Sequence, residues 1–447
     1  MGIKRLFSYM KENFEQRDLS YLSGKRLGID GMNWLYQAFF SVCENIDSIH
    51  VPMVRKVEYR FKLLEKYNIS FTVVIDGKNL VNKALALRRR KEKREYYQKQ
   101  AEKYENEEDF GQIAVYEKYS QEVTPELIFF FIDYLKYKKF DYIVAPYEAD
   151  SQLAYLLKTN KIDYICSEDS DFLAMSCFKL VRGIKREGNC EIFNDTIKTP
   201  KKINPTSWEM FSSLSERRRT MLCVMTGCDY IDNLRNVGFI TLIKLFYKLR
   251  DINDKAFDDA LLAFLKKRPL DVDIDEYLRD VKRYCISFTS QVVYNPDTKN
   301  LINAQPLKPC EAKIPDIDSY VGAKFDNVVK FIQGDLSFQE HKPRGPSDGD
   351  MSKFVGFVNF VPVDSEKRLN NLCQVPFGFE NFNQPIIEPP VSRIKPTGRP
   401  FRKEIHSRNT SVTDKKTFNG SFITRSISRQ RLSDEERTIF SKRVKIL

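Results

Sequence analysis

Histidine is scarce in this sequence, and its cysteines follow no metal-binding pattern. The 447 residues include 3 widely spaced histidines, and none of the 9 cysteines forms a Cys-x-x-Cys pair. Zinc sites are built from closely spaced Cys and His ligands, so we do not expect a zinc centre. Cys166, Cys223 and Cys285 lie among apolar residues, and we expect them to be reduced thiols in the core.

Long apolar runs are also missing. No run approaches the roughly 20 residues of a membrane-spanning helix, and charged residues interrupt the segment where a signal peptide would have its apolar core. Gly2 does not begin a myristoylation motif, because Leu6 stands where that motif needs Ser or Thr. We therefore expect a chain that is neither secreted nor associated with a membrane.

Basic residues outnumber acidic ones. The 73 Lys and Arg against 61 Asp and Glu give a formal net charge of +12. This excess favours a polyanionic partner, with nucleic acid ahead of an anionic membrane surface. A hydrophobic content of 42% is sufficient for a sizeable core in at least one domain.

Strand and helix patterns alternate as far as about residue 335, and the chain then becomes rich in Pro, Asn, Ser and Arg. Short apolar runs predict buried strands at 26–30, 71–76, 141–145 and 163–166, and helical periodicity falls at 53–67, 123–137 and 149–157. The alternation predicts an α/β domain with a mostly parallel sheet flanked by helices. Beyond residue 343 we expect a disordered tail.

Six acidic residues stand at or just after the ends of the four predicted strands: Asp30, Asp76, Glu148, Asp150, Asp169 and Asp171. Each one alone could close a turn, cap a helix or face solvent. In an open parallel sheet, however, the carboxyl ends of the strands meet at one edge, where ligands bind. Carboxylates gathered there repel one another unless cations neutralise them, so the pattern favours a metal site.

Carboxylate ligands without His or Cys suit hard cations, with Mg²⁺ or Mn²⁺ ahead of Zn²⁺. Two such ions roughly 4 Å apart can activate water and stabilise the leaving oxygen of a phosphodiester.

Two basic elements could hold DNA. A strongly basic helical segment follows Asp76 and contains Lys78, Lys83, Arg88, Arg89, Arg90, Lys91, Lys93 and Arg94. Lys83 and Arg90 are about two helical turns apart and can reach one phosphate. The second element is a helix–turn–helix pattern in which Gly238 precedes the run 239–249 with Lys244, so that backbone N–H groups can bind a phosphate. The simpler interpretations are a solvated charged helix and a packing glycine.

Several strings occur together in one order: Met1-Gly-Ile3, Ile29-Asp30, Ile75-Asp-Gly77, Ala145-Pro-Tyr-Glu-Ala-Asp150, Ser167-Glu-Asp-Ser-Asp171 and Gly227-Cys-Asp-Tyr230. This order resembles the 5′ structure-specific nuclease superfamily over about three quarters of the chain. The stretches 145–155 and 168–174 resemble its exonuclease 1 branch more than the flap endonucleases.

The resemblance implies metal ligands at the six acids and also at Asp229, with Lys83 and Arg90 at the scissile phosphate. We expect Asp30, Asp76, Glu148 and Asp150 to centre on one ion, and Asp169, Asp171 and Asp229 on the other. It places Gly2 near the active site and a helix-two-turn-helix element, often with a K⁺ ion, at about 222–248. It implies a DNA-repair nuclease of the nucleus that acts on duplex DNA with recessed, nicked or flapped 5′ ends. We expect a monomer.

The expected regions are an N-terminal nuclease region with a basic helical arch (1–105), a region completing the same α/β domain (106–215), a helix-two-turn-helix region with wrap-around helices (216–340) and the disordered tail (341–447). In the tail, 392–403 and 442–445 are candidate nuclear localisation or nucleic-acid-binding signals. Segment 351–354 faintly resembles a motif that docks on mismatch-repair proteins.

The sequence departs from the family pattern at three positions. Arg5 and Asn236 stand where glycines are common, and Tyr36 stands where relatives tend to carry His, although it can still stack on a base. In the arch, we expect contacts to the DNA backbone from Arg88, Arg89, Lys91 and Arg94. Three rival functions are a flap-specific endonuclease, a DNA-binding scaffold without catalysis, and a small-molecule phosphatase, which the basic segment disfavours.

Overall fold

The computed structural model describes residues 2–3, 5–42, 49–106, 110–196 and 205–338. The predicted tail and its candidate signals at 351–354, 392–403 and 442–445 lie outside the described residues. None of the described helices is both long enough and apolar enough to cross a membrane.

The centre of the fold is a seven-stranded sheet in the order β1-β7-β6-β5-β2-β3-β4. Strands β2 to β6 run parallel to one another, and β7 pairs antiparallel with both β6 and β1. The strands are β1 Phe14–Asp18, β2 Arg26–Asp30, β3 Ser70–Ile75, β4 Tyr142–Val144, β5 Tyr164–Cys166, β6 Leu180–Arg182 and β7 Asn189–Phe193, with β8 Val292–Asn295 and β9 Asn300–Asn303 in a separate hairpin.

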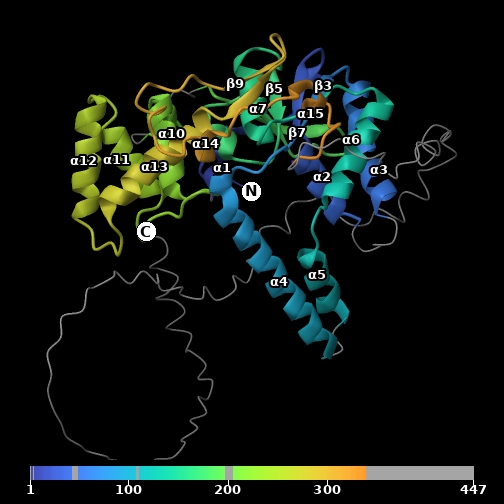
Figure 1. Cartoon of the computed structure of the whole chain (residues 1–447), viewed down its shortest axis with the longest axis horizontal. Helices are drawn as coiled ribbons and strands as arrows, with labels where there is room; N and C mark the ends of the chain where they lie inside the picture. The colour runs from blue at the N-terminus through green and yellow to red at the C-terminus, as the bar shows by residue number, and fades with distance from the viewer. Residues whose placement is uncertain (1, 4, 43–48, 107–109, 197–204, 339–447) are drawn as a thin grey trace, which may run out of the picture. The chain divides into compact units, whose positions relative to one another are not determined.

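The helices lie between and after these strands (Figure 1). They are α1 Leu6–Tyr9, α2 Gly31–Phe40, α3 His50–Lys66, α4 Ala84–Asn106, α5 Phe110–Ser120, α6 Pro125–Lys138, α7 Ala149–Lys158, α8 Asp171–Ala174, α9 Ser207–Ser212, α10 Glu216–Thr226, α11 Phe239–Lys248, α12 Asp254–Lys266, α13 Ile274–Thr289, α14 Asp318–Val321 and α15 Val328–Ile332, with 3₁₀ turns η1 Lys11–Asn13, η2 Leu19–Leu22 and η4 Val81–Lys83.

The α/β architecture predicted from the sequence is confirmed, and all four predicted strands are present within one or two residues of their expected limits. The helix expected at 123–137 begins at Pro125, because proline's fixed φ suits the first helical turn. Cys166 and Cys223 are buried free thiols and Cys285 is half-buried. The divisions at residues 105 and 215 stay predictions.

Two hydrophobic cores lie on opposite faces of the sheet. Successive side chains of a strand point to opposite faces, so Val73 and Ile75 pack with α2, α3 and α6 whereas Val74 packs in the cluster that contains α7 and α10 to α13. Figure 1 shows α10 to α13 on one side of the sheet and α3 and α6 on the other. Both faces are therefore covered, as a parallel sheet requires.

The order of the strands creates a crevice at the end of β2. The chain forms β2, β3 and β4 in adjacent positions and then returns to the other side of β2 to form β5. Connections on the two sides of β2 therefore leave in opposite directions, and a topological switch point of this kind is where ligands bind in open α/β sheets.

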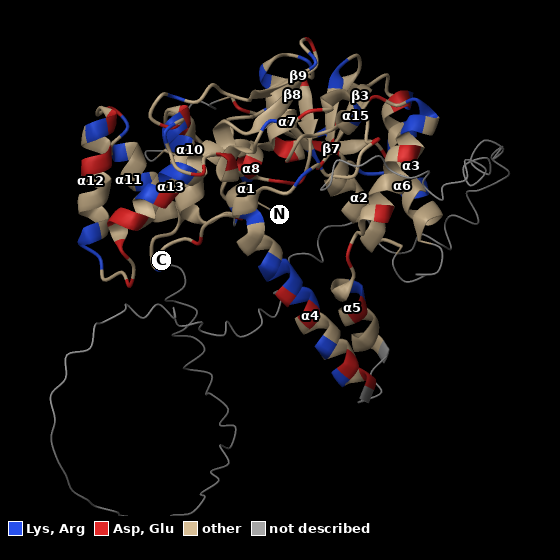
Figure 2. Cartoon of the chain, viewed as in Figure 1, with Lys and Arg blue, Asp and Glu red and all other residues tan. Residues whose placement is uncertain are grey.

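Helices α4 and α5 form a hairpin that extends away from the sheet (Figure 1). Tyrosines pair across it, with ring centroids 5.3 Å apart for Tyr104 and Tyr116 and 5.5 Å apart for Tyr97 and Tyr119. Among the described residues of α4, only Ala86 and Ala101 are buried. Figure 2 shows Lys and Arg along α4, most densely in the half nearer the sheet, so aromatic pairs hold together a hairpin with little aliphatic core.

Replacing Arg5 with glycine should stabilise the protein. Arg5 precedes α1 with φ 59°, a left-handed conformation that costs a non-glycine residue roughly 1 kcal/mol or more, and its side chain is exposed. We expect Arg5→Gly to raise the free energy of unfolding by about 1 kcal/mol in denaturant titrations. Arg5→Ala, which removes the side chain but keeps Cβ, is the matched control. Equal gains in both variants would contradict backbone strain as the cause.

Candidate active site

The carboxylates at the ends of β2 and β3 are fixed by hydrogen bonds to neighbouring helices. Asp30 caps α2 by accepting from Asn33 N at 2.9 Å, and it also accepts from Ser167 Oγ at 2.7 Å. Asp76 accepts from Ala149 N at 2.7 Å, at the start of α7. Asp30 therefore caps a helix and also belongs to the acid cluster, which is the group of acids at the strand ends predicted from the sequence.

Gly77 brings the end of β3 against the end of β4. Its N–H donates to Tyr147 O at 2.7 Å, and a Cβ at this position would overlap the carbonyl oxygen of Ala145. Only glycine allows this approach. The approach places Asp76 beside the turn that carries Glu148.

Three carboxylates form a candidate cation site among the described residues. One oxygen of each of Asp150, Asp169 and Asp171 lies within 4.8 Å of the others. Asp171 accepts from Ile3 N at 3.0 Å, and its own N–H donates to Asp169 Oδ1 at 2.9 Å. No hydrogen-bond donor to Asp150 is found among the described residues, so its carboxylate is available to a cation.

Asp150 lies near acids of both expected ligand groups. The sequence pattern grouped it with Asp30, Asp76 and Glu148, and one of its oxygens lies within 4.8 Å of oxygens of Asp169 and Asp171. The charges of Asp30 and Asp76 also act on it, and the division of the ligands between two ions stays a prediction. Asp150 lies in the first turn of α7, two residues after the N-cap Glu148. Residues two apart at a helix start project in different directions, because each residue advances the helix by about 100°.

Burial and mutual repulsion make the ionised cluster costly. Burial raises the pKa of Asp30 to about 7, against the opposing effect of its hydrogen bonds. Burial raises the pKa of Asp76 and Asp169, and it raises the pKa of Asp150 and Asp171 well above the usual range, with neighbouring carboxylates adding to the shift. Cations would relieve this cost.

Lys83 and Glu148 form an ion pair at the rim of the cluster. Lys83 Nζ lies 2.8 Å from Glu148 Oε1 and 3.8 Å from Asp229 Oδ2. Burial alone would lower the pKa of Lys83, but the carboxylates of Glu148, Asp229 and Asp76 raise it overall. Burial alone would raise the pKa of Glu148, but Lys83 and hydrogen-bond donors lower it overall. Both groups are therefore charged.

The hairpin of α4 and α5 is the predicted arch, and ion pairs join its base to the loop between α10 and α11. Arg90 Nη2 lies 2.6 Å from Asp229 Oδ2, and Arg89 Nη1 donates to Asp232 at 3.0 Å. Lys83 lies in the turn η4 and Lys78 precedes it, so the helix begins later than expected. Lys83 and Arg90 nevertheless meet at the same carboxylate of Asp229.

The remaining basic residues of the arch face solvent or acids of the hairpin. Arg88 pairs with Glu92 at 2.8 Å, and Arg94 pairs with Glu122 at 2.8 Å. Lys91 is exposed.

Gly2 lies against the acid cluster. Its φ is 78°, and a Cβ there would overlap Asp169 Oδ1. Tyr36 is half-buried and stacks on Phe40 with ring centroids 6.3 Å apart. Burial raises the pKa of Tyr36, and the charges of Arg90 and Asp76 also act on it, so this ring lies close to the site.

Sequence reasoning missed three residues that hold the carboxylates in place. Ser167 joins Asp30 to the β5 turn, Tyr230 donates to Glu148 Oε2 at 3.0 Å, and Gln291 donates to the same oxygen at 3.0 Å. Ser167 and Tyr230 belong to the strings that carry the family resemblance. Gln291 had no sequence signal, since it lies 143 positions from Glu148.

The helix-two-turn-helix candidate presents an open helix start. Gly238 is the N-cap of α11, and a Cβ there would meet no atom within 4 Å. Asn236 has φ 61°, a left-handed conformation that Asn tolerates better than most residues. Lys244 is exposed on α11.

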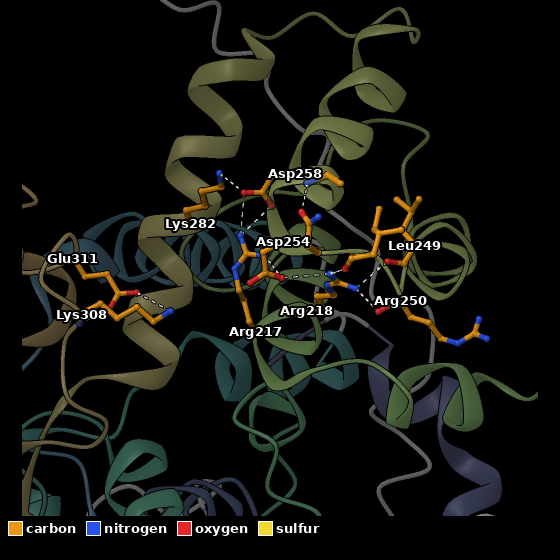
Figure 3. Close-up of polar contacts among 12 residues, drawn as sticks. Arg217, Arg218, Leu249, Arg250, Asp254, Asp258, Lys282, Lys308 and Glu311 are labelled. Atoms are coloured by element: carbon orange, nitrogen blue, oxygen red, sulfur yellow. Dashed lines mark hydrogen bonds and ion pairs between the residues drawn. The ribbon is translucent and has the colours of Figure 1, made fainter.

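A buried arginine fixes the other end of α11 (Figure 3). Arg218 donates to Leu249 O at 2.9 Å and to Arg250 O at 2.6 Å, satisfying carbonyls at the helix C-terminus. Asp258 of α12 accepts from Arg217 at 3.0 Å and pairs with Lys282 at 2.8 Å, which joins α10, α12 and α13 (Figure 3).

Comparison with known proteins shows similarity to nucleases. The XPG N-terminal domain matches residues 1–97 and the XPG I-region matches residues 139–229. Exodeoxyribonuclease 1 of Saccharomyces cerevisiae is 29% identical over 421 residues, covering 90% of this chain and 57% of the relative. Exodeoxyribonuclease 1 of Schizosaccharomyces pombe is 29% identical over 336 residues, covering 74% and 56%. The chain is thus similar to exonuclease 1 proteins and to the two XPG regions. It spans a little over half the length of these relatives.

Two solved XPG-type structures are also similar. The catalytic core of Rad2 in complex with DNA substrate is 19% identical with a TM-score of 0.46, covering 83% of this chain and 100% of that one. The Holliday junction-resolving enzyme GEN1 with product DNA and Mg²⁺ is 18% identical with a TM-score of 0.42, covering 66% of each chain.

The raised carboxyl pKa values predict a pH-dependent effect of Mg²⁺. Without metal, the folded state holds protons that the unfolded state releases near pH 4, so this contribution to stability is lost as pH rises through about 7, the pKa of Asp30. Mg²⁺ requires the ionised carboxylates. We expect the rise in melting temperature given by Mg²⁺ over EDTA to be larger at pH 7.5 than at pH 5.5.

The control for this measurement is Asp150→Asn, in which the Mg²⁺ increment should shrink at both pH values. An increment in the unaltered protein that does not depend on pH would contradict competition between protons and metal.

Proposed function

We propose that this protein is a metal-dependent nuclease that hydrolyses phosphodiester bonds of duplex DNA from a 5′ end. The observation that carries the proposal is the close group of Asp150, Asp169 and Asp171 beside two cations, Lys83 and Arg90, that converge on Asp229. Anionic ligands next to cations that can bind a phosphate are what metal-assisted phosphodiester hydrolysis requires.

The donor set fits hard divalent cations. Every candidate ligand is a carboxylate, and Asp150 has no hydrogen-bond donor among the described residues. Asp30, Asp76 and Glu148 would hold one ion, and Asp150, Asp169, Asp171 and Asp229 the other, as Mg²⁺ with Mn²⁺ as a substitute. When bound, two such ions supply an activated water and stabilise the leaving oxygen.

Lys83 and Arg90 would orient the scissile phosphate. Both are cations, and their charged groups approach the carboxylates proposed to hold the ions. A phosphate bound between them would lie next to the acid cluster. Gly2 leaves the space beside Asp169 and Asp171 free of a side chain, and Tyr36 offers an aromatic ring near Arg90.

The duplex would be held on both sides of this centre. The N-terminus of α11 at Gly238 offers backbone N–H groups to a phosphate, and we propose K⁺ there as a further bridge. Exposed Lys244 on α11 and Lys91 on α4 add positive charge, and Arg88, Arg89 and Arg94 can exchange their ion pairs for phosphates. Such contacts bind DNA without reading its sequence.

The two yeast relatives described above are exodeoxyribonucleases, which supports an exonuclease. We propose that it acts from a 5′ end, also cleaves 5′ flaps, and works in DNA repair in the nucleus. Recessed, nicked and flapped 5′ ends are the proposed substrates. We propose that the protein acts as a monomer, and that the tail binds mismatch-repair proteins.

Digestion of a duplex labelled at the 5′ side of a nick tests the nuclease. We expect small labelled products from the unaltered protein with Mg²⁺ and none with EDTA. Asp171→Asn keeps an oxygen that can accept from Ile3 N but removes the charge, and we expect it to lower the rate at least a hundredfold. DNA binding without cleavage by either protein would indicate a DNA-binding scaffold in place of a nuclease.

A substrate series distinguishes the proposed exonuclease from a flap-specific endonuclease and from a small-molecule phosphatase. A flap-specific endonuclease would cut a flapped duplex and leave the nicked duplex intact. A small-molecule phosphatase would retain its activity after Lys83→Met and Arg90→Met, whereas we expect each change to lower nuclease turnover.

Gly238→Ala tests the proposed phosphate contact. A Cβ at this position meets no protein atom, so folding should be unchanged, but the methyl group would obstruct a phosphate at the helix start. We expect several-fold weaker duplex binding, measured by fluorescence anisotropy with Ca²⁺ in place of Mg²⁺, at an unchanged melting temperature. Lys244→Ala is the comparison for loss of charge alone. Unchanged binding by Gly238→Ala would remove this helix start from the DNA interface.

A further inference from the structure

Glu148 has an unusually complete set of hydrogen-bond donors for a buried carboxylate. Lys83 contacts Oε1 at 2.8 Å, Tyr230 OH lies 3.1 and 3.0 Å from the two oxygens, and Gln291 Nε2 lies 3.0 Å from Oε2. Only one of these donors is charged. Gln291 is 1% exposed and Tyr230 is 4% exposed, so both neutral donors are buried.

Neutral donors orient a carboxylate without neutralising it. Lys83 competes with any cation for the charge of Glu148, whereas an amide and a phenol leave the negative charge available. Hydrogen bonds of this kind fix the direction of a metal ligand before the metal binds.

The amide of Gln291 bonds through its nitrogen. Its Nε2 donates to Glu148 Oε2 at 3.0 Å and lies 3.5 Å from Tyr230 OH, while its Oε1 is buried and has no hydrogen-bond partner among the described residues. Rotating the amide by 180° would turn its oxygen toward the carboxylate, which is repulsive. A buried amide with an unsatisfied oxygen is costly, so its contribution lies in the bond that its nitrogen makes.

The backbone around Gln291 is tied to the same helix that carries Glu148. Gln291 O accepts from Ala304 N at 2.8 Å, at the base of the β8–β9 hairpin. Gln152 of α7, fully buried, donates to Tyr294 O at 2.9 Å and accepts from Tyr294 N at 2.7 Å. The hairpin is thereby held in one register against the first turns of α7.

We propose that Gln291 is a positioning residue for metal binding, which holds Glu148 in the orientation a divalent cation requires and links the β8–β9 hairpin to the metal centre. The inference rests on the proposed metal-dependent function. It assigns to the region after α13 a part in the chemistry, in addition to covering the sheet.

The test is Mg²⁺ and Mn²⁺ binding by isothermal titration calorimetry to the full chain without DNA. Gln291→Met keeps the length of the side chain but has no donor, and we expect it to weaken divalent-ion binding about tenfold. Gln291→Asn keeps an amide on a shorter side chain, so its affinity for divalent ions should lie between that of the unaltered protein and that of Gln291→Met. Gln305→Met is the matched control, because Gln305 also donates to a glutamate, Glu216, at 3.0 Å. The affinity of Gln305→Met for divalent ions should equal that of the unaltered protein.

A Glu148→Gln background separates positioning from general loss of structure. If Gln291 acts through Glu148, Gln291→Met should weaken metal binding no further in that background. A further tenfold loss there, or metal binding by Gln291→Met and Gln291→Asn equal to that of the unaltered protein, would overturn the inference.

Cleavage of the nicked duplex gives an independent reading. Gln291→Met should raise the Mg²⁺ concentration for half-maximal activity and leave the KM for DNA unchanged. If the unaltered protein binds Mg²⁺ in a Gln291-dependent way but cuts no DNA, the nuclease proposal fails while the positioning role stands. If it cuts DNA and Gln291→Met needs no additional Mg²⁺, the positioning role fails alone.

Discussion

Repulsion between buried carboxylates is the constraint around which this structure is organised. Asp30, Asp150, Asp169 and Asp171 come from three different connections of the sheet, and the switch point at β2 brings them together. Their raised pKa values express the cost of that gathering. A protein whose only requirement was a stable core would gain by replacing them with apolar residues. Cations bound at this sheet edge would offset the repulsion, which accounts for the presence of several carboxylates there.

The same repulsion explains the position of the arch. Lys83 and Arg90 supply positive charge to Glu148 and Asp229, and Arg89 extends this pairing to the loop before α11. The cations proposed to bind DNA and the carboxylates proposed to bind metal are thus partners of one another in this structure. An electrostatic network of this kind joins the arch to the sheet edge and to the loop before α11.

Segments far apart in the chain complete the centre from several sides. Ile3 donates to Asp171 from the N-terminal side, and Gln291 donates to Glu148 from the region after α13. Gly77 and Gly2 allow backbone approaches that any side chain would block. The geometry of the acids therefore depends on the whole described domain, because each hydrogen bond that fixes a carboxylate begins on a different element.

The sequence by itself determined the α/β architecture, the four central strands and the acids at their ends, because burial of a parallel strand requires a continuous apolar run and the residue after it must turn. It also indicated which basic residues follow Asp76. The sequence did not predict the antiparallel strands β1 and β7, since the β1 segment Phe14–Asp18 is short and mostly polar. Only the tertiary structure decided that Asp150 joins Asp169 and Asp171, and that Gln291 reaches Glu148. Those contacts depend on the direction in which side chains leave a helix and on how segments 143 positions apart are packed, and neither is encoded in a local pattern.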